Sequence, residues 1–166
     1  MMVELRELSI KDGDDVFDML NEIGPGENGF MNSAFGISYE EFPSYLKNNV
    51  DFSKGINLSS GYVPQTIYWL YVDSKPVGMG KFRHYLNDFL REHGGHIGYC
   101  IRPTERGKGY GTIILRELLK KAKDEEVDDA LIICDAINTA SRKVIEGNNG
   151  VLESIKEGEC KYWIKL

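Results

Sequence analysis

Three glycines and two cationic side chains lie together in the segment Arg106-Gly107-Lys108-Gly109-Tyr110-Gly111. Closely spaced glycines let the backbone turn tightly and direct successive N–H groups at one point. The positive end of a following helix would strengthen this point, and Arg102 adds a further cation nearby. The segment therefore predicts a loop that binds a phosphate group. The alternative interpretation is a glycine-rich turn that only connects a strand to a helix.

The spacing of these glycines excludes the best-known phosphate loop. A Walker A loop needs a glycine, four further residues and then Gly-Lys-Ser/Thr. Here Gly109 follows Lys108, and Arg102 stands where the first glycine would be. A dinucleotide fingerprint, Gly-x-Gly-x-x-Gly, also fits poorly, because Gly111 comes one residue early and no repeated strand–helix–strand units follow.

The elements that position this loop can be predicted from apolar periodicity. Before the loop, 96–101 has a strand pattern, and its internal Gly98 indicates a bulge or a close backbone approach. After the loop, apolar residues recur at helical spacing from Ile113 to Ala122. The other patterns predict strands at 3–8, 66–72, 77–84, 130–134, 151–155 and 161–166, helices at 12–23, 39–49 and 139–146, glycine-rich loops at 27–38 and 51–61, and a polar segment at 87–95.

This order of elements predicts one α+β domain that spans residues 1–166. Its central sheet should be mixed and mostly antiparallel, with about six to seven strands flanked by helices. The chain has 166 residues, of which 42% are hydrophobic and 28% are charged. This composition excludes collagen, coiled coils and wholesale disorder, and the length suffices to bury a core without disulfides.

The net charge and the cysteine content limit which binding partners and which cellular compartment are expected. A net charge of -6 argues against binding to nucleic acid, and no apolar run approaches the ~20 residues that cross a bilayer. Cys100, Cys134 and Cys160 form no Cys-x-x-Cys pair, and their odd number suits buried free thiols in a reducing cytoplasm. The N-terminus lacks the cationic and apolar regions of a signal peptide. We therefore predict a cytoplasmic protein with no metal, nucleic acid or membrane partner, and leave a homodimer open.

The glycine loop and its surroundings resemble the GNAT superfamily of N-acetyltransferases. The cofactor signature of that family, Arg/Gln-x-x-Gly-x-Gly/Ala between a strand and a long helix, corresponds to 106–111. The preceding segment 99–103 and the downstream segment 138–146 also look like the family. The resemblance is specific over 96–151. It implies a GNAT-like acyl-CoA N-acyltransferase fold with acetyl-CoA as the cosubstrate.

The resemblance also implies which residues hold acetyl-CoA. The amides of 106–112 would bind its pyrophosphate, and the strand that ends at Ile101 would pair with the pantetheine arm through its backbone. In this family that strand splays from the next one, and the thioester enters the gap. Asn138 and Ser141 would reach the pantetheine or thiol end, although Asn138 also suits a helix N-cap. The expected cofactor-binding residues are Tyr99, Cys100, Ile101, Arg102, Arg106, Gly107, Lys108, Gly109, Tyr110, Gly111, Thr112, Asn138, Ser141 and Lys143.

The residues for proton transfer depart from the family pattern. The family often has a Tyr acid seven residues after the asparagine, where this chain has Ile145, and a Glu base on the strand before the loop, where it has none. Tyr162 is the candidate acid, with Tyr110 or a water as substitutes. His96, whose ordinary pKa suits a base, is the candidate base, and a solvent-facing histidine at the start of the strand is the alternative interpretation. Asp135 is a further candidate for accepting a proton.

We therefore predict an acetyl-CoA-dependent N-acetyltransferase in which an amine attacks the thioester directly. The alternative is a CoA-binding regulatory or sensor module without turnover, which the absence of a Tyr at Ile145 favours. A transferase for another acyl-CoA is a third hypothesis. No motif identifies the acceptor amine. We expect its site in the segment 24–61, with the segment 85–95 as the alternative.

Overall fold

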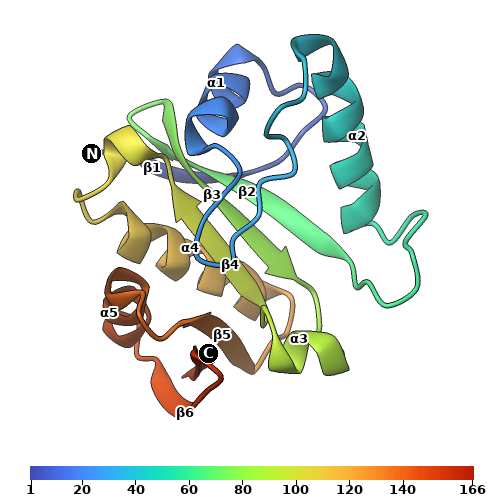
Figure 1. Cartoon of the computed structure of the whole chain (residues 1–166). Helices are drawn as coiled ribbons and strands as arrows, with labels where there is room; N and C mark the ends of the chain where they lie inside the picture. Colours follow the sequence, from blue (N-terminus) through green and yellow to red (C-terminus); the bar gives the residue numbers. More distant parts are fainter.

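The computed structural model describes residues 1–166, and Figure 1 shows how its elements are arranged. The strands are β1 (Val3–Glu7), β2 (Gln65–Val72), β3 (Lys75–Arg83), β4 (Ile97–Ile101), β5 (Asp129–Asp135), β6 (Val151–Lys156) and β7 (Glu159–Lys165). The helices are α1 (Asp14–Ile23), α2 (Phe42–Ser53), α3 (Asp88–Glu92), α4 (Tyr110–Asp124) and α5 (Thr139–Gly147). Two short 3-10 helices, η1 (Tyr39–Glu41) and η2 (Pro103–Glu105), precede α2 and the glycine loop.

The strands form two antiparallel sheets, in the orders β1-β2-β3-β4 and β5-β7-β6. Between the two sheets, the only pairing is one bridge that joins Gly95, just before β4, to Ile132 of β5. A Cβ at Gly95 would collide with the carbonyl oxygen of Leu131, so this close approach requires glycine. The α+β class and the expected number of strands are confirmed. The single mixed sheet that was predicted is divided into two sheets. Apart from the bridge at Gly95, β4 pairs with β3 and β5 pairs with β7, so no ladder joins β4 to β5.

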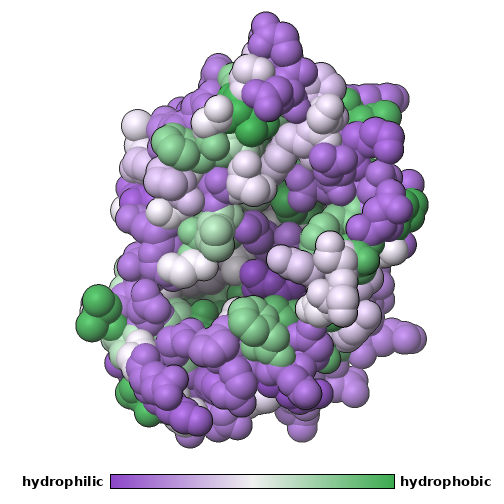
Figure 2. Space-filling model, turned by 45° about the vertical axis from the view of Figure 1, so that its right-hand side comes forward, coloured by the Kyte–Doolittle hydropathy of each residue, from purple (hydrophilic) through white to green (hydrophobic).

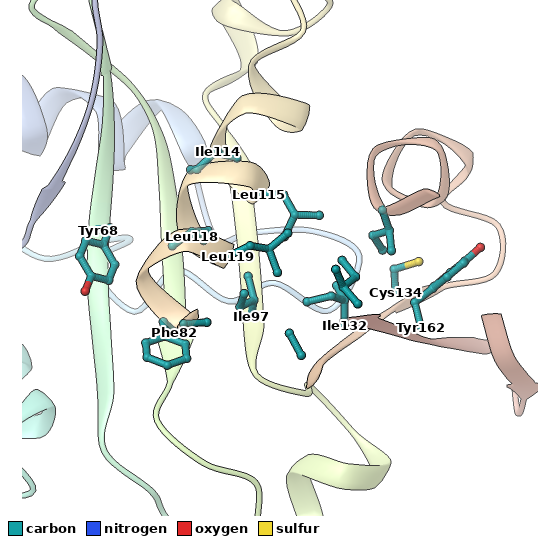
Figure 3. Packing of buried hydrophobic residues seen from close by; sticks show 14 of the residues in the cluster. Tyr68, Phe82, Ile97, Ile114, Leu115, Leu118, Leu119, Ile132, Cys134 and Tyr162 are labelled. Carbon is teal, nitrogen blue, oxygen red and sulfur yellow. The ribbon is translucent and has the colours of Figure 1, made fainter. Parts of the chain in front are cut away.

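Helix α4 covers one face of the β1–β4 sheet and sets the position of the glycine loop. Its buried side chains Ile114, Leu115 and Leu118 belong to a cluster that continues onto β5 and β7 (Figure 3). Gly80 of β3 makes room for the helix, since an added Cβ would lie 2.6 Å from Cδ1 of Leu118. The close packing of α4 on the sheet holds its N-terminus near the end of β4, with only η2 and the glycine loop between them.

Helices α1 and α2 cover the opposite face of the same sheet (Figure 1). The loop after α1 is held in place by Asn32, whose Nδ2 donates to the carbonyl oxygens of Leu20 and Gly24 at 2.8 Å each. These bonds hold the segment 24–38 against the end of α1. None of the helices combines the length and the apolar character that crossing a membrane would require.

Two predicted segments differ from the structure in their helices. The polar segment 87–95 contains the short helix α3, which begins where the side chain of Asn87 accepts a hydrogen bond from the N–H of Leu90. The helix predicted at 39–49 begins as η1 behind a capping box between Ser38 and Glu41, and then continues as α2 to Ser53. In both cases polar capping residues set where the helix begins, which the apolar pattern alone does not specify.

Candidate active site

A cleft of about 750 Å³ opens where the two sheets separate. A hollow crosses the middle of the face shown in Figure 2. The glycine loop, β4, β5 and the start of α5 line most of the cleft, and the segment 27–31, the end of β3 and the region of α3 line the rest. The cleft therefore collects residues from both halves of the chain.

The glycine loop presents free backbone donors to this cleft. The N–H groups from 107 to 112 have no acceptor within the protein, whereas the N–H groups of Arg106 and Ile113, on either side, donate to Pro103 and Gly109. Gly107 and Gly109 have φ angles of 78° and 83°, a left-handed conformation that favours glycine. The first N–H groups of a helix lack intrahelical partners and carry its positive dipole end. The loop thus fits the diphosphate of a CoA-type ligand.

The cationic side chains of the loop, by contrast, already have acidic partners. Nη1 of Arg106 lies 2.7 Å from Glu27, and its Nε donates to the carbonyl oxygen of Ile101 at 3.0 Å. Nζ of Lys108 lies 2.7 Å from the buried carboxylate of Glu105, and Lys108 does not line the cleft. An anion at this loop would therefore be bound by the backbone more than by the cationic side chains that the sequence suggested.

Strand β4 offers an open backbone edge along the cleft. Its ladder with β3 is fixed by hydrogen bonds from the N–H of Arg83 to His96 and from the N–H of Arg102 to Val77. Because bonded and non-bonded pairs alternate along an antiparallel ladder, the N–H and C=O of Tyr99 point away from β3. No strand covers that edge beyond the bridge at Gly95. The edge can pair with an extended arm such as pantetheine.

The side chain of Tyr99 enters the same part of the cleft. Its hydroxyl is buried without a hydrogen-bond partner, although Ser141 lies beside it. Burial raises the pKa of Tyr99 to about 12, so the hydroxyl keeps its proton at neutral pH. Ser141 is held by Asn138, which caps α5 by accepting from the N–H of Ser141 at 3.1 Å and donating to its Oγ at 3.0 Å. Asn138 therefore both caps the helix and lines the cleft.

His96 is held inside the protein and does not line the cleft. It is only 5% exposed, so the solvent-facing alternative is wrong. The ring Nδ1 of His96 accepts from the backbone N–H of Leu131 at 2.9 Å, and the backbone N–H of His96 donates to the carbonyl oxygen of Leu131. Burial lowers the pKa of His96 to about 4. These contacts tie β4 to β5 and occupy one ring nitrogen.

Tyr162 also lies outside the cleft lining. Figure 3 shows it at one end of the buried cluster, beside Cys134. Its hydroxyl donates to Glu146 at 2.7 Å and accepts from Nε of Arg142 at 3.0 Å. Both partners belong to α5, so the hydroxyl anchors that helix to β7.

Two further expected cofactor residues point elsewhere. Arg102 turns toward α1, where its Nη2 lies 3.0 Å from Glu22 and its Nη1 donates to the carbonyl oxygen of Pro76 at 3.0 Å. The guanidinium lowers the pKa of Glu22 to about 2. Lys143 is exposed on α5, outside the cleft.

The cysteines are all buried and unbridged. Cys100 and Cys134 line the cleft. Burial raises the pKa of both thiols, that of Cys134 to about 12, which disfavours the reactive thiolate. No group of three or more His, Cys, Asp or Glu side chains could hold a metal ion.

Lys81 and Arg83 of β3 line the cleft next to the segment 27–31, and no motif in the sequence indicated them. Phe89 and His93, which also line the cleft, lie in the segment 85–95 that was the alternative expected for the acceptor. The available signal was weak, because two basic residues that alternate at the end of a strand usually face solvent. Only the packing of the segment 27–31 over β3 encloses them.

Comparison with known proteins agrees with this geometry. Residues 3–149 match the family described as acetyltransferase (GNAT) domain, and the chain belongs to that family. Its members use acetyl-CoA as the acetyl donor. No curated protein sequence matches the chain.

Solved structures share the fold at low sequence identity. RimL, a ribosomal L7/L12 alpha-N-protein acetyltransferase in complex with coenzyme A, is 17% identical with a TM-score of 0.74, over 100% of this chain and 95% of that chain. The N-acetyltransferase PseH of Campylobacter jejuni, in complex with acetyl coenzyme A, is 13% identical with a TM-score of 0.64, over 99% of both chains. The acetyl transferase of Salmonella typhimurium that modifies the N-terminal serine of L7/L12 is 17% identical with a TM-score of 0.67, over 100% of this chain and 96% of that chain.

Proposed function

We propose that this protein is an acetyl-CoA-dependent N-acetyltransferase in which an amine attacks the thioester directly. One observation carries the proposal: the unbonded N–H groups of 107–112 open onto a cleft that continues along the free edge of β4. The loop would hold the diphosphate and the β4 edge the pantetheine arm, so the thioester would lie near Tyr99. The space beyond, between the segment 27–31 and α3, is left for the acceptor.

Tyr99 has the properties of a proton donor for the leaving thiolate. Its hydroxyl is buried, has no partner, and remains protonated because burial raises its pKa to about 12. It can replace the Tyr that the family often has where this chain has Ile145, which is itself fully buried. The CoA sulfur, leaving as a thiolate, would take the proton of the Tyr99 hydroxyl. Solvent would later reprotonate Tyr99.

The attacking amine must first lose a proton, because a free amine has a pKa of roughly 10 and is mostly protonated at neutral pH. Asp135 lines the cleft at the end of β5, and its carboxylate has no basic partner. The proposal gives Asp135 the role of accepting this proton, directly or through water. After attack the nitrogen loses its second proton to solvent as the C–S bond breaks, so the product is the neutral amide and CoA leaves as the thiol.

An acceptor screen tests the proposal against a CoA-binding module without turnover. The protein would be incubated with acetyl-CoA and amines of several classes, including amino acids, polyamines, aminoglycosides and peptides with free N-termini. We expect thiol release that depends on one class, with the acetylated product seen by mass spectrometry. CoA binding by calorimetry without thiol release from any amine would favour the binding module. Absence of CoA binding would contradict both hypotheses.

A further inference from the structure

Lys81 and Arg83 stand side by side at the acceptor end of the cleft. They are two residues apart on β3, so their side chains leave the same face of the sheet. Gly98 of β4 lies opposite Lys81 and has no side chain to fill the space above it. An added Cβ there would lie 3.5 Å from the ring of Phe30 and 3.8 Å from Nη1 of Arg83. These residues enclose a recess, which we call the β3 recess.

Neither cation of the β3 recess has an acidic partner. Nζ of Lys81 donates to the carbonyl oxygen of Met31 and lies 4.6 Å from the centre of the Phe30 ring. Nη1 of Arg83 donates to the carbonyl oxygens of Gly94 and Gly95, at 3.0 and 3.4 Å. A guanidinium carries five N–H donors, and only Nη1 is occupied here.

Other basic groups along the cleft are neutralised. Arg106 pairs with Glu27, and Nδ1 of His93 lies 2.9 Å from Glu159. The β3 recess therefore concentrates unpaired positive charge in a chain whose net charge is -6.

Burial makes this charge costly in the absence of an anion. It lowers the pKa of Lys81 to about 8, with a further contribution from the charge of Arg83, and it also lowers the pKa of Arg83. An anion between the two side chains would neutralise them and accept charge-assisted hydrogen bonds, which are the stronger kind. A cationic ligand would add repulsion instead.

We infer that the β3 recess binds an anionic group of the acceptor, a carboxylate or a phosphate. The inference rests on the proposed function and names its substrate class: a small molecule that carries both an amine and an anion. Gly98 and Tyr99 are neighbours on β4 and both line the cleft, although they face opposite sides of the sheet. The acceptor would therefore reach from the recess to the thioester at the open edge of β4, within the same cleft. Polyamines, which carry only positive charge, are excluded as preferred acceptors.

A binding experiment tests the recess without turnover. Inorganic phosphate and acetate would be titrated by calorimetry into CoA-saturated protein, because bound CoA occupies the glycine loop. Lys81→Met should weaken the better of the two probes at least tenfold, and Arg83→Gln should do the same. Lys165→Met, which removes an exposed lysine outside the cleft, should bind like wild type. Circular dichroism checks each fold, and the gentler Lys81→Met suffices if Arg83→Gln does not fold.

The outcomes separate the recess from the proposed function. The tighter probe identifies phosphate or carboxylate as the preferred group. Binding of neither probe, or equal binding by wild type and Lys81→Met, would overturn the inference. If Lys81→Met loses anion binding but the wild-type protein acetylates no amine, the anion site is supported and the proposed enzymatic activity is contradicted. If the wild-type protein acetylates an amino acid and its carboxamide with equal kcat/KM, the activity is supported and the anion site is contradicted.

Discussion

The proposed donor end and the proposed acceptor end of the cleft are built in different ways. The donor end uses backbone groups of one continuous stretch, from the open edge of β4 to the N–H groups of 107–112. The proposed acceptor end uses side chains from the segment 27–31, β3, the region of α3 and the start of β7. A backbone site tolerates many side chains, whereas a side-chain site changes with each substitution. Such a difference would let proteins of one fold share a donor site while their acceptor sites differ.

Removing the Tyr99 hydroxyl should have the largest effect of the changes that follow, and the effect should be on turnover. Tyr99→Phe keeps the ring and the β4 backbone, so acetyl-CoA affinity should change less than twofold. Loss of a positioned acid should lower kcat by about 10²–10⁴-fold. Steady-state kinetics with an identified acceptor and calorimetry with CoA measure the two effects separately.

Tyr68→Phe is the matched control for Tyr99→Phe. Tyr68 is also a buried tyrosine with a pKa raised to about 12 by burial, but it lies on β2 outside the cleft. Its kcat should stay near that of wild type. Equal losses in both variants would mean that Tyr99 acts through packing and not through its proton.

Gly109→Glu should weaken CoA binding at least tenfold. The substitution places a carboxylate among the free N–H groups, and φ of 83° strains any residue with a Cβ. Gly109→Ala separates the two causes, because a Cβ at this position meets nothing within 4 Å and adds strain without charge. Its effect should be the smaller one. Unchanged CoA affinity in Gly109→Glu, with the fold intact by circular dichroism, would remove the glycine loop from the donor site.

The contact between Glu22 and Arg102 joins α1 to the residue that follows β4. Glu22→Gln should lower the free energy of unfolding at pH 7 by about 1.5–3 kcal/mol, the usual value for a hydrogen bond to a charged group. The folded-state pKa of Glu22 is lowered to about 2 from 4.5. The stability from this carboxylate is therefore complete above pH 4.5 and lost as the pH falls toward 2. Denaturant titrations at several pH values should show this loss of unfolding free energy between pH 4.5 and 2 in the wild type and not in Glu22→Gln.

Tyr162→Phe should have the smallest effect on turnover. The hydroxyl anchors α5 to β7 outside the cleft, so kcat should stay within twofold while the melting temperature falls by a few degrees. A large loss of kcat at unchanged acetyl-CoA affinity would return the role of proton donor to Tyr162. It would also mean that the catalytic part of the site is not confined to β4.

Much of the donor end could be predicted from sequence, because its determinants are local. The glycines at 107 and 109 allow the left-handed turns, and the apolar stripe from Ile114 to Ala122 specifies the helix behind them. The strands were also predicted to within a few residues, since alternation and β-branched residues carry that signal along the chain. The short helix α3 was missed because its start depends on the cap at Asn87 and not on periodicity.

Local patterns along the chain therefore suffice to predict the α+β class, the order of the elements and the glycine loop. The packing of the whole chain is needed to show where the sheet divides, that His96 bonds to Leu131 across the division, and that Lys81 and Arg83 face a cleft and not solvent. Backbone conformation depends on neighbouring residues, so a motif can encode the direction of an N–H group. The partners of a side chain are set by segments distant in sequence, whose meeting depends on the packing of the whole domain.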